Sequence, residues 1–185
     1  MTRPTARPMR HSDRLFVDGQ WAMPSTDALI DIIAPASEEV AFSVAEAKEA
    51  DIAAAVGAAR RAFDEGPWPG MTHRERAEYL LAIARNIRKR ADDMAAAAPL
   101  ENGILHRFAL ASAGSVGAVF ESYANLAETF PFIERHVPGP TGGGGFGLLV
   151  REPVGVVAAI VPWNGPALIS AYNGCSPISV SATVG

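Results

Sequence analysis

The feature of the sequence that most constrains the fold is an uninterrupted apolar run, Val154 to Val161, that ends at Pro162-Trp163-Asn164-Gly165-Pro166. Because apolar and polar residues do not alternate within the run, it predicts a strand buried on both faces, as in a parallel sheet covered by helices. In open α/β sheets, ligands bind in the crevice beyond the carboxyl ends of the strands. The amide of Asn164 is therefore predicted to lie where chemistry is usually done. The alternative is that Asn164, followed by glycine, only stabilises a turn.

Composition and charge exclude several classes of protein. The 185 residues are 49% hydrophobic and 19% charged, which allows a sizeable core and argues against intrinsic disorder. A net charge of −4 does not suggest a nucleic-acid partner, and no run of 18 or more uncharged apolar residues predicts a membrane span. One cysteine excludes a disulfide scaffold and a Cys-based zinc site, and the four scattered histidines do not suit metal ligation. We therefore expect no metal site, no nucleic acid and no membrane among the partners of this chain.

The first residues form a separate segment. Residues 1–13 are rich in arginine, but Pro4 and Pro8 break any helix there, and the segment has neither an apolar face nor an apolar stretch. It is predicted to be a disordered tail rather than a targeting signal. A cytoplasmic location follows by default.

A small antiparallel sheet is predicted next. Asp18-Gly19 is a dipeptide favoured in tight hairpin turns, because both residues tolerate positive φ, and short strands flank it. Residues 29–33 and 40–44 are predicted to be two further short strands, separated by a turn-like segment.

Beyond residue 50 the apolar period becomes helical. Asp51 is placed to cap a first helix, Thr72 and Glu75 fit the capping box of a second, and Pro131 stops a later one. Between them Pro99 is predicted to interrupt a helical stretch, which ends at the glycine-capped Glu101-Asn102-Gly103. The apolar positions are Ile52, Val56, Ala59 and Phe63 in the first helix, Ala77, Leu80, Leu81, Ala84, Ile87 and Met94 in the second, and Val116, Phe120, Tyr123, Ala127 and Phe130 in the later one.

A glycine-rich segment precedes the apolar run. Gly142, Gly144 and Gly147 satisfy the string G-x-G-x-x-G, which would make a small dinucleotide-binding module one option. That motif requires a strand before the glycines and a helix after them, whereas the residues from Phe146 onward are typical of a strand. The glycines are therefore predicted to form a flexible hairpin tip.

A family resemblance rests on strings that are more specific than glycine counts. Residues 149–157, containing Arg151-Glu152-Pro153-Val154-Gly155, and residues 160–164, ending in Pro162-Trp163-Asn164, closely resemble the segment that leads into the active site of the NAD(P)-dependent aldehyde dehydrogenase superfamily. Residues 16–21, 58–68 and 100–103 resemble it as well, in the right order, so the likeness covers Arg14 to Tyr172.

The resemblance implies a reaction and a set of site residues. In that family a cysteine thiolate attacks an aldehyde, hydride passes to NAD or NADP, and water releases a carboxylic acid. The asparagine matching Asn164 donates its side-chain N–H to the thiohemiacetal oxygen, as in an oxyanion hole. The residues matching Ile160, Val161, Pro162 and Trp163 line the nicotinamide side of the cofactor site. Residues 132–149 match an arm used for oligomerisation, so a homo-oligomer is expected.

Other parts of the family pattern are missing from these 185 residues. Cys175 lies eleven residues after Asn164, whereas the family nucleophile lies far downstream, and Asn173-Gly174-Cys175-Ser176-Pro177 does not resemble its loop. The general-base glutamate, the ribose-binding residues and the pyrophosphate glycines also belong to later segments. Cys175 is therefore predicted to be a small buried or tail residue. The alternative to an enzyme is a non-catalytic, truncated remnant or an oligomerisation partner of a full-length relative.

The predicted fold is α/β, the N-terminal part of an aldehyde dehydrogenase-like fold, with antiparallel hairpins, a helical layer and the start of a Rossmann-like parallel sheet. Its predicted divisions are a tail over 1–13, part of a cofactor-binding domain over 14–131, an oligomerisation arm over 132–149, and the start of the nucleotide-binding sheet over 150–185.

Overall fold

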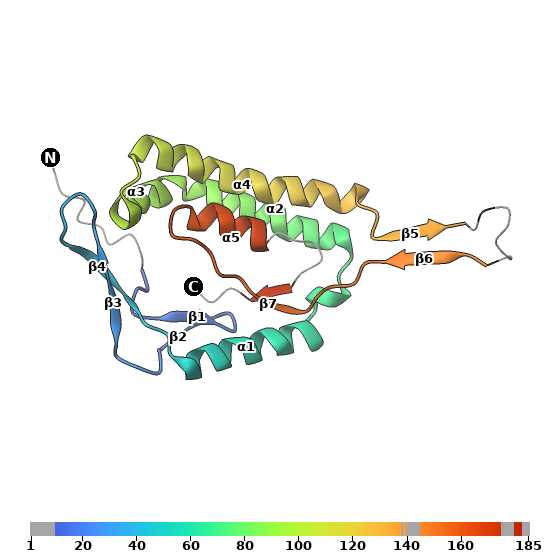
Figure 1. Cartoon of the computed structure of the whole chain (residues 1–185), viewed down its shortest axis with the longest axis horizontal. Helices are drawn as coiled ribbons and strands as arrows, with labels where there is room; N and C mark the ends of the chain where they lie inside the picture. The colour runs from blue at the N-terminus through green and yellow to red at the C-terminus, as the bar shows by residue number, and fades with distance from the viewer. Residues whose placement is uncertain (1–9, 138, 140–144, 175–179, 183–185) are drawn as a thin grey trace.

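The computed structural model describes residues 10–137, 139, 145–174 and 180–182 (Figure 1). Two hairpins open the chain and are followed by helices, an extended hairpin and a short parallel strand pair. In chain order the elements are β1 (Leu15–Val17), β2 (Gln20–Ala22), β3 (Leu29–Ile33), β4 (Val40–Ala45), α1 (Glu49–Asp64), a 3-10 turn (Trp68–Gly70), α2 (His73–Lys89), α3 (Ala91–Asn102), α4 (His106–Thr129), β5 (Ile133–His136), β6 (Gly147–Val150), β7 (Val156–Ala158), α5 (Pro166–Gly174) and β8 (Val180–Ala182).

Both hairpins at the beginning of the chain were predicted. β1 pairs with β2 around Asp18 and Gly19, whose φ angles of 54° and 74° explain why this dipeptide occupies the turn. β3 pairs with β4 in antiparallel register, with an irregularity at Ile33. Of the predicted tail, the structure describes residues 10–13, and these contact the hairpins. The His11 ring lies 4.7 Å from that of Trp21, and the Ser12 carbonyl accepts a 2.7 Å hydrogen bond from the Ala45 N–H.

The predicted cap of α1 was wrong by three residues. The helix begins after Lys48, and Asp51 occupies its first turn, where its carboxylate accepts a 2.9 Å hydrogen bond from the Lys48 N–H. The same carboxylate accepts bonds from the Ser25 N–H and hydroxyl, which ties the preceding loop to the helix. These hydrogen bonds, first that of Lys48 and then those of Ser25, lower the pKa of Asp51. An acidic residue satisfies orphan N–H groups from either position, so its identity alone did not locate the helix start.

Helices α2, α3 and α4 form the core and are called the helical layer below; α5 packs against α4 (Figure 1). The Thr72 hydroxyl accepts from the Glu75 N–H, and Glu75 accepts from the Thr72 N–H, so the predicted capping box is present. The buried residues of α2 belong to its predicted stripe: Ala77, Leu80 and Ala84. Small residues allow close approach, since a Cβ added at Gly117 of α4 would lie 3.4 Å from the Ala84 carbonyl oxygen.

Two helices extend further than predicted. Pro99 does not interrupt α3, which continues to Asn102 and ends at Gly103 with a φ of 75°. Ala95 lies one turn before Pro99 and is fully buried, and α3 packs along α4, so tertiary packing holds the helix through the proline. α4 begins at His106, ten residues before the first apolar position predicted for it. Its earlier turns bury Ala109 and Ala113, whose small side chains give a weak periodic signal.

The apolar run at residues 154–161 differs from its prediction. Only Val156–Ala158 form a strand, β7, which pairs in parallel with β8. Val154 is 84% exposed and Ile160 is 92% exposed, so the prediction of burial on both faces was wrong for the run. Helix α1 contacts β7 and β8, but it leaves much of the run accessible. An apolar sequence indicates that a segment tends to be buried. Burial also requires another element that covers the apolar side chains.

The predicted fold class is confirmed: antiparallel hairpins, a helical layer and a parallel strand pair occur in the expected order. Across the described part of the chain, no helix is long and apolar enough to cross a membrane.

Candidate active site

The predicted site residues lie together in the loop that connects β7 to α5. Ile160, Val161, Pro162, Trp163 and Asn164 are consecutive in this loop, which follows the carboxyl end of a parallel strand. Trp163 is 76% exposed and Asn164 is also exposed, whereas Val161 is half-buried. The loop therefore presents an apolar surface beside one amide.

The end of the loop is fixed by the start of a helix. Pro166 is the first residue of α5, a position that proline favours because its fixed φ suits the helix and its missing N–H has no partner there. The Ile169 N–H donates a 3.0 Å hydrogen bond to the Gly165 carbonyl, which closes the first turn. Asn164 thus lies two residues before a helix. No described residue forms a hydrogen bond with its side chain, so the amide N–H is free to donate.

A contact that was not predicted connects this loop to the helical layer. The Asn102 side chain at the end of α3 donates a 3.4 Å hydrogen bond to the Trp163 carbonyl, across 61 residues of sequence. Its oxygen accepts a 3.1 Å bond from the Ile104 N–H, which fixes the side chain at the turn. The glycine-capped sequence Glu101-Asn102-Gly103 indicated a helix end. That pattern gave no signal of contact with residue 163, because the contact depends on tertiary structure. Glu101, the residue before Asn102 in this string, is exposed.

The strand before the loop depends on one glycine. Gly155 is buried, has a φ of 114°, and lies against α1, where an added Cβ would be 3.7 Å from Arg60 Nη1. Arg60 is itself held by Asp64 and by the face of the Phe63 ring. A residue with a side chain is strained at this φ, so glycine sets the entry angle of the strand that carries the loop.

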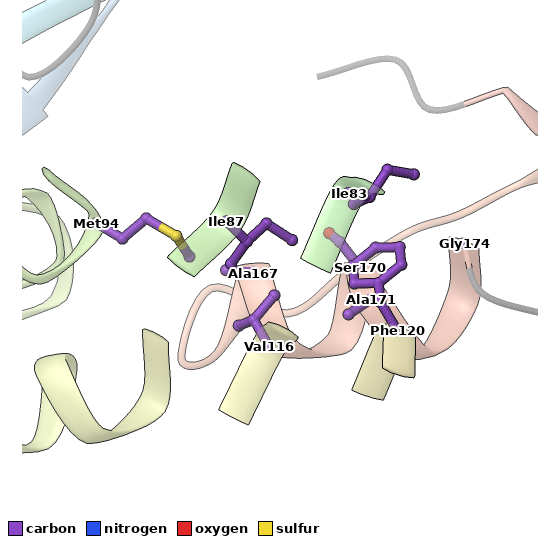
Figure 2. A pocket seen from close by; sticks show the side chains of 9 residues that line it. All are labelled: Ile83, Ile87, Met94, Val116, Phe120, Ala167, Ser170, Ala171 and Gly174. Carbon is purple, nitrogen blue, oxygen red and sulfur yellow. The ribbon is translucent and has the colours of Figure 1, made fainter. Parts of the chain in front are cut away.

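A separate apolar groove of about 420 Å³ lies between the helical layer and α5 (Figure 2). Its lining comprises Ile83, Ile87, Met94, Val116, Phe120, Ala167, Ser170, Ala171 and Gly174. Ser170 supplies the one hydroxyl and the lining has no ionisable side chain, so the groove offers packing surface rather than acid–base groups.

The described groups with shifted pKa values lie away from the loop and serve structural contacts. Hydrogen bonds with Thr72 lower the pKa of Glu75, and burial, followed by the charge of Arg76, lowers the pKa of His73. The bond from Arg88 lowers the pKa of Glu121 and joins α2 to α4. Within residues 10–137, 139, 145–174 and 180–182, no three His, Cys, Asp or Glu side chains are grouped to hold a metal.

The predictions for the G-x-G-x-x-G string and for Cys175 concern residues of which the structure describes only some. Cys175, Gly142 and Gly144 lie outside the described residues. Gly147, the last glycine of the G-x-G-x-x-G string, begins β6, which pairs with β5. A strand after the glycines lacks the helix N-terminus that the dinucleotide motif requires.

The order of the elements and the site loop suggest one class of protein, and a comparison with known proteins identifies that class. Residues 21–184 match the model of the aldehyde dehydrogenase family. The chain belongs to the aldehyde dehydrogenase family.

Individual relatives agree with this assignment. Betaine aldehyde dehydrogenase of Bacillus subtilis (strain 168) is 31% identical over 94% of this chain. An NAD-dependent aldehyde dehydrogenase from Sinorhizobium meliloti superposes with a TM-score of 0.83 at 32% identity and covers 92% of this chain. A betaine aldehyde dehydrogenase variant from Staphylococcus aureus, solved in complex with NAD+, gives 0.79 at 34% identity over 87% of this chain. The chain spans 35%, 34% and 32% of these three proteins, which is about a third of their length.

Proposed function

We propose that this chain contributes the oxyanion-stabilising loop of an NAD(P)-dependent aldehyde dehydrogenase, which oxidises an aldehyde to a carboxylic acid through a cysteine thiohemiacetal. The observation that carries the proposal is the exposed Pro162-Trp163-Asn164 loop between a parallel strand and a helix. Since the chain spans about a third of its relatives, the nucleophile and the base are proposed to come from sequence outside these 185 residues.

The chemical role proposed for Asn164 follows from its amide. The side chain is exposed and no described residue occupies its N–H, so it can donate to an oxygen that gains negative charge during the reaction. A donor that is held in place before the reaction stabilises that charge without reorganisation, and loss of one such donor costs about 10²–10³ in rate. The Asn102 contact with the Trp163 carbonyl holds the preceding residue.

The neighbouring loop residues suit one face of a nicotinamide cofactor. Ile160 and Trp163 are largely exposed apolar side chains that a flat ring could cover, and Val161 and Pro162 continue that surface. When bound, NAD or NADP supplies the oxidant that accepts hydride. The described residues provide apolar contact and no phosphate-binding element, so they fit part of the cofactor and leave NAD and NADP undistinguished.

The test measures aldehyde-dependent NADH formation by a chimera in which residues 21–184 replace the matching segment of a full-length aldehyde dehydrogenase, which supplies the nucleophile and the base. Asn164→Ala in this chimera is the diagnostic variant. Activity that falls by about 10²–10³ in kcat in Asn164→Ala supports the proposed role. Asn173→Ala, which removes an exposed amide from α5, is the matched control and should keep full activity. Equal activity of the chimera with Asn164 and the chimera with Asn164→Ala would contradict the role of Asn164.

A second candidate function is favoured by one observation, the apolar β5–β6 hairpin. Ile133, Phe146 and Leu148 of this hairpin are exposed. The chain would then have a non-catalytic role and associate with other copies or with full-length relatives through the hairpin, as a homo-oligomer or an oligomerisation partner. Co-purification of the 185-residue protein with a full-length family member, together with a chimera that stays inactive, would favour this function. The cytoplasmic location stays a prediction.

A further inference from the structure

The β5–β6 hairpin, called the arm below, projects from the helical layer at the end of α4 (Figure 1). Its strands pair from Ile133 opposite Val150 to His136 opposite Gly147. An isolated two-stranded hairpin has little stability of its own, so its direction depends on the contacts at its base. Those contacts converge on Arg151, the residue that follows β6.

Arg151 makes several contacts with the chain that leaves α4. Its backbone N–H donates a 3.0 Å hydrogen bond to the Phe132 carbonyl, which extends the ladder by one residue. Its guanidinium donates a 2.6 Å bond from Nη1 to the Pro131 carbonyl and pairs through Nη2 with Glu134 at 2.5 Å. The guanidinium carbon also lies 5.4 Å from the centroid of the Phe130 ring. One side chain therefore contacts both β5 and residues 130–132, which are called the linker below because they connect α4 to β5.

The linker is fixed on its other side by α2. The Phe132 ring stacks on His73, the first residue of α2, with centroids 3.6 Å apart and planes 5° from parallel. Phe130 packs edge-on against Phe132 at 4.9 Å. The linker is thus held between the start of α2 and the guanidinium of Arg151.

We propose that Arg151 is a positioning residue that fixes the direction of the arm relative to the helical layer and thereby presents the exposed apolar side chains of the arm to a second copy of the chain. The contribution of Arg151 to assembly rests on the proposed oligomeric role of the chain. The contribution of Arg151 to the direction of the arm is independent of that role. Because the arm is already ordered in the single chain, less conformational entropy is lost when two copies associate, which favours binding.

Arginine suits this position better than lysine. Its planar fork donates to a carbonyl and a carboxylate at once, and its flat face lies against an aromatic ring. Both Arg151 and Glu134 are half-buried, so their pair is less screened than a fully exposed one. A lysine would keep the positive charge beside Glu134 but could not donate to the Pro131 carbonyl in the same geometry.

The experiment measures the distance distribution between two spin labels, one on the arm and one on the helical layer. Labels are attached at His136→Cys on β5 and Asn86→Cys on α2, both exposed positions, in a Cys175→Ser background. The diagnostic variant is Arg151→Met, with Arg151→Lys as the conservative variant. Arg135→Met is the matched control, since it removes an exposed arginine from β5 whose side chain forms no hydrogen bond, ion pair or ring contact with the described residues.

We expect a single narrow distribution of label distances for the protein with Arg151 and for Arg135→Met. In Arg151→Met the distribution should become broad, and in Arg151→Lys its width should lie between the two. Circular dichroism should be unchanged throughout, because the helical layer does not depend on the arm. A narrow, unshifted distance in Arg151→Met would overturn the proposal. If Arg151→Met fails to fold, Glu134→Gln decides in its place, because it removes only the ion pair and should still broaden the distance.

Sedimentation velocity of the unlabelled proteins separates the two levels of the proposal. Weaker self-association in Arg151→Met than in Arg135→Met supports both levels. A native protein that is monomeric at every concentration would refute arm-mediated assembly, while the label distances would still decide whether Arg151 fixes the arm.

Discussion

The helical layer and the loop that carries the candidate site are stabilised in different ways. In the layer, α2 and α4 bury small and aliphatic side chains against each other, and Ala84 is fully buried at their contact. The loop after β7 exposes Ile160 and Trp163 and is held by one helix start and one side-chain hydrogen bond to its backbone, while a glycine at positive φ sets the start of the strand that leads into it. The layer depends on buried area, whereas the loop depends on backbone geometry. Truncation of an apolar side chain should therefore affect stability far more in the first region than in the second, where substitutions that strain the backbone should matter most.

The largest expected effect is Leu80→Ala in the helical layer. Leu80 is 6% exposed and belongs to the cluster with Ala77 and Ala124, so truncation leaves a cavity. We expect the free energy of unfolding to fall by about 2–5 kcal/mol, measured by urea denaturation followed by circular dichroism. Leu80→Met conserves volume and should lose less than about 1.5 kcal/mol. A loss from Leu80→Ala as small as that from Leu80→Met would remove the distinction between the two regions.

Gly155→Ala tests the dependence of the site segment on backbone geometry. At a φ of 114° an alanine is strained, and we expect a loss of about 1–3 kcal/mol in unfolding free energy, measured by thermal and urea denaturation. The same substitution at Gly114, inside α4 with no atom within 4 Å of the added Cβ, should instead stabilise by about 0.5–1 kcal/mol. Effects of the same sign at the two glycines would contradict this interpretation.

Thr72→Ala examines a local contribution to the helical layer. The substitution removes the hydroxyl that accepts from the Glu75 N–H at the start of α2, and it should cost about 0.5–2 kcal/mol in chemical denaturation. Thr72→Ser keeps the acceptor and is expected to stay close to the native value. If serine proved as damaging as alanine, the methyl group and not the cap would be responsible.

The smallest expected effect is Ile160→Ala. This aliphatic truncation resembles Leu80→Ala in chemistry, but Ile160 is 92% exposed, so the unfolding free energy should change by less than about 0.5 kcal/mol. Differential scanning calorimetry of both variants compares the two regions directly. A large loss from Ile160→Ala would show that the loop is covered in solution and would contradict its exposure here.

Local patterns predicted much of the fold. The Thr72 capping box, the glycine at the end of α3 and the Asp18-Gly19 turn are each determined by neighbouring residues, and the structure contains all of them. Pro99 was misinterpreted because burial of Ala95 in the contact with α4 outweighs a local preference. The extent of β7 was also misjudged, since apolar composition does not state which elements cover a strand.

The sequence predicted which segment carries the site, but it did not predict the contacts that hold this segment in place. The residues from Ile160 to Asn164 are consecutive, so motif and chain order were sufficient to bring them together. Asn102 was not predicted because its contact with Trp163 joins positions 61 residues apart. Arg151 was part of the recognised string, yet its contacts with Pro131 and Glu134 arise only when the arm folds back on the end of α4.

The paired ends of the arm have a consequence for protein engineering. Because Ile133 lies opposite Val150, the chain leaves and re-enters the molecule at nearly the same point. Residues 135–148 could therefore be replaced by an Asn-Gly turn while the Glu134–Leu149 pair is kept, which would leave the connection between α4 and β7 unchanged. Removing or adding two residues in each strand would preserve which side chains face each side, so arm length could be varied independently of the rest of the molecule.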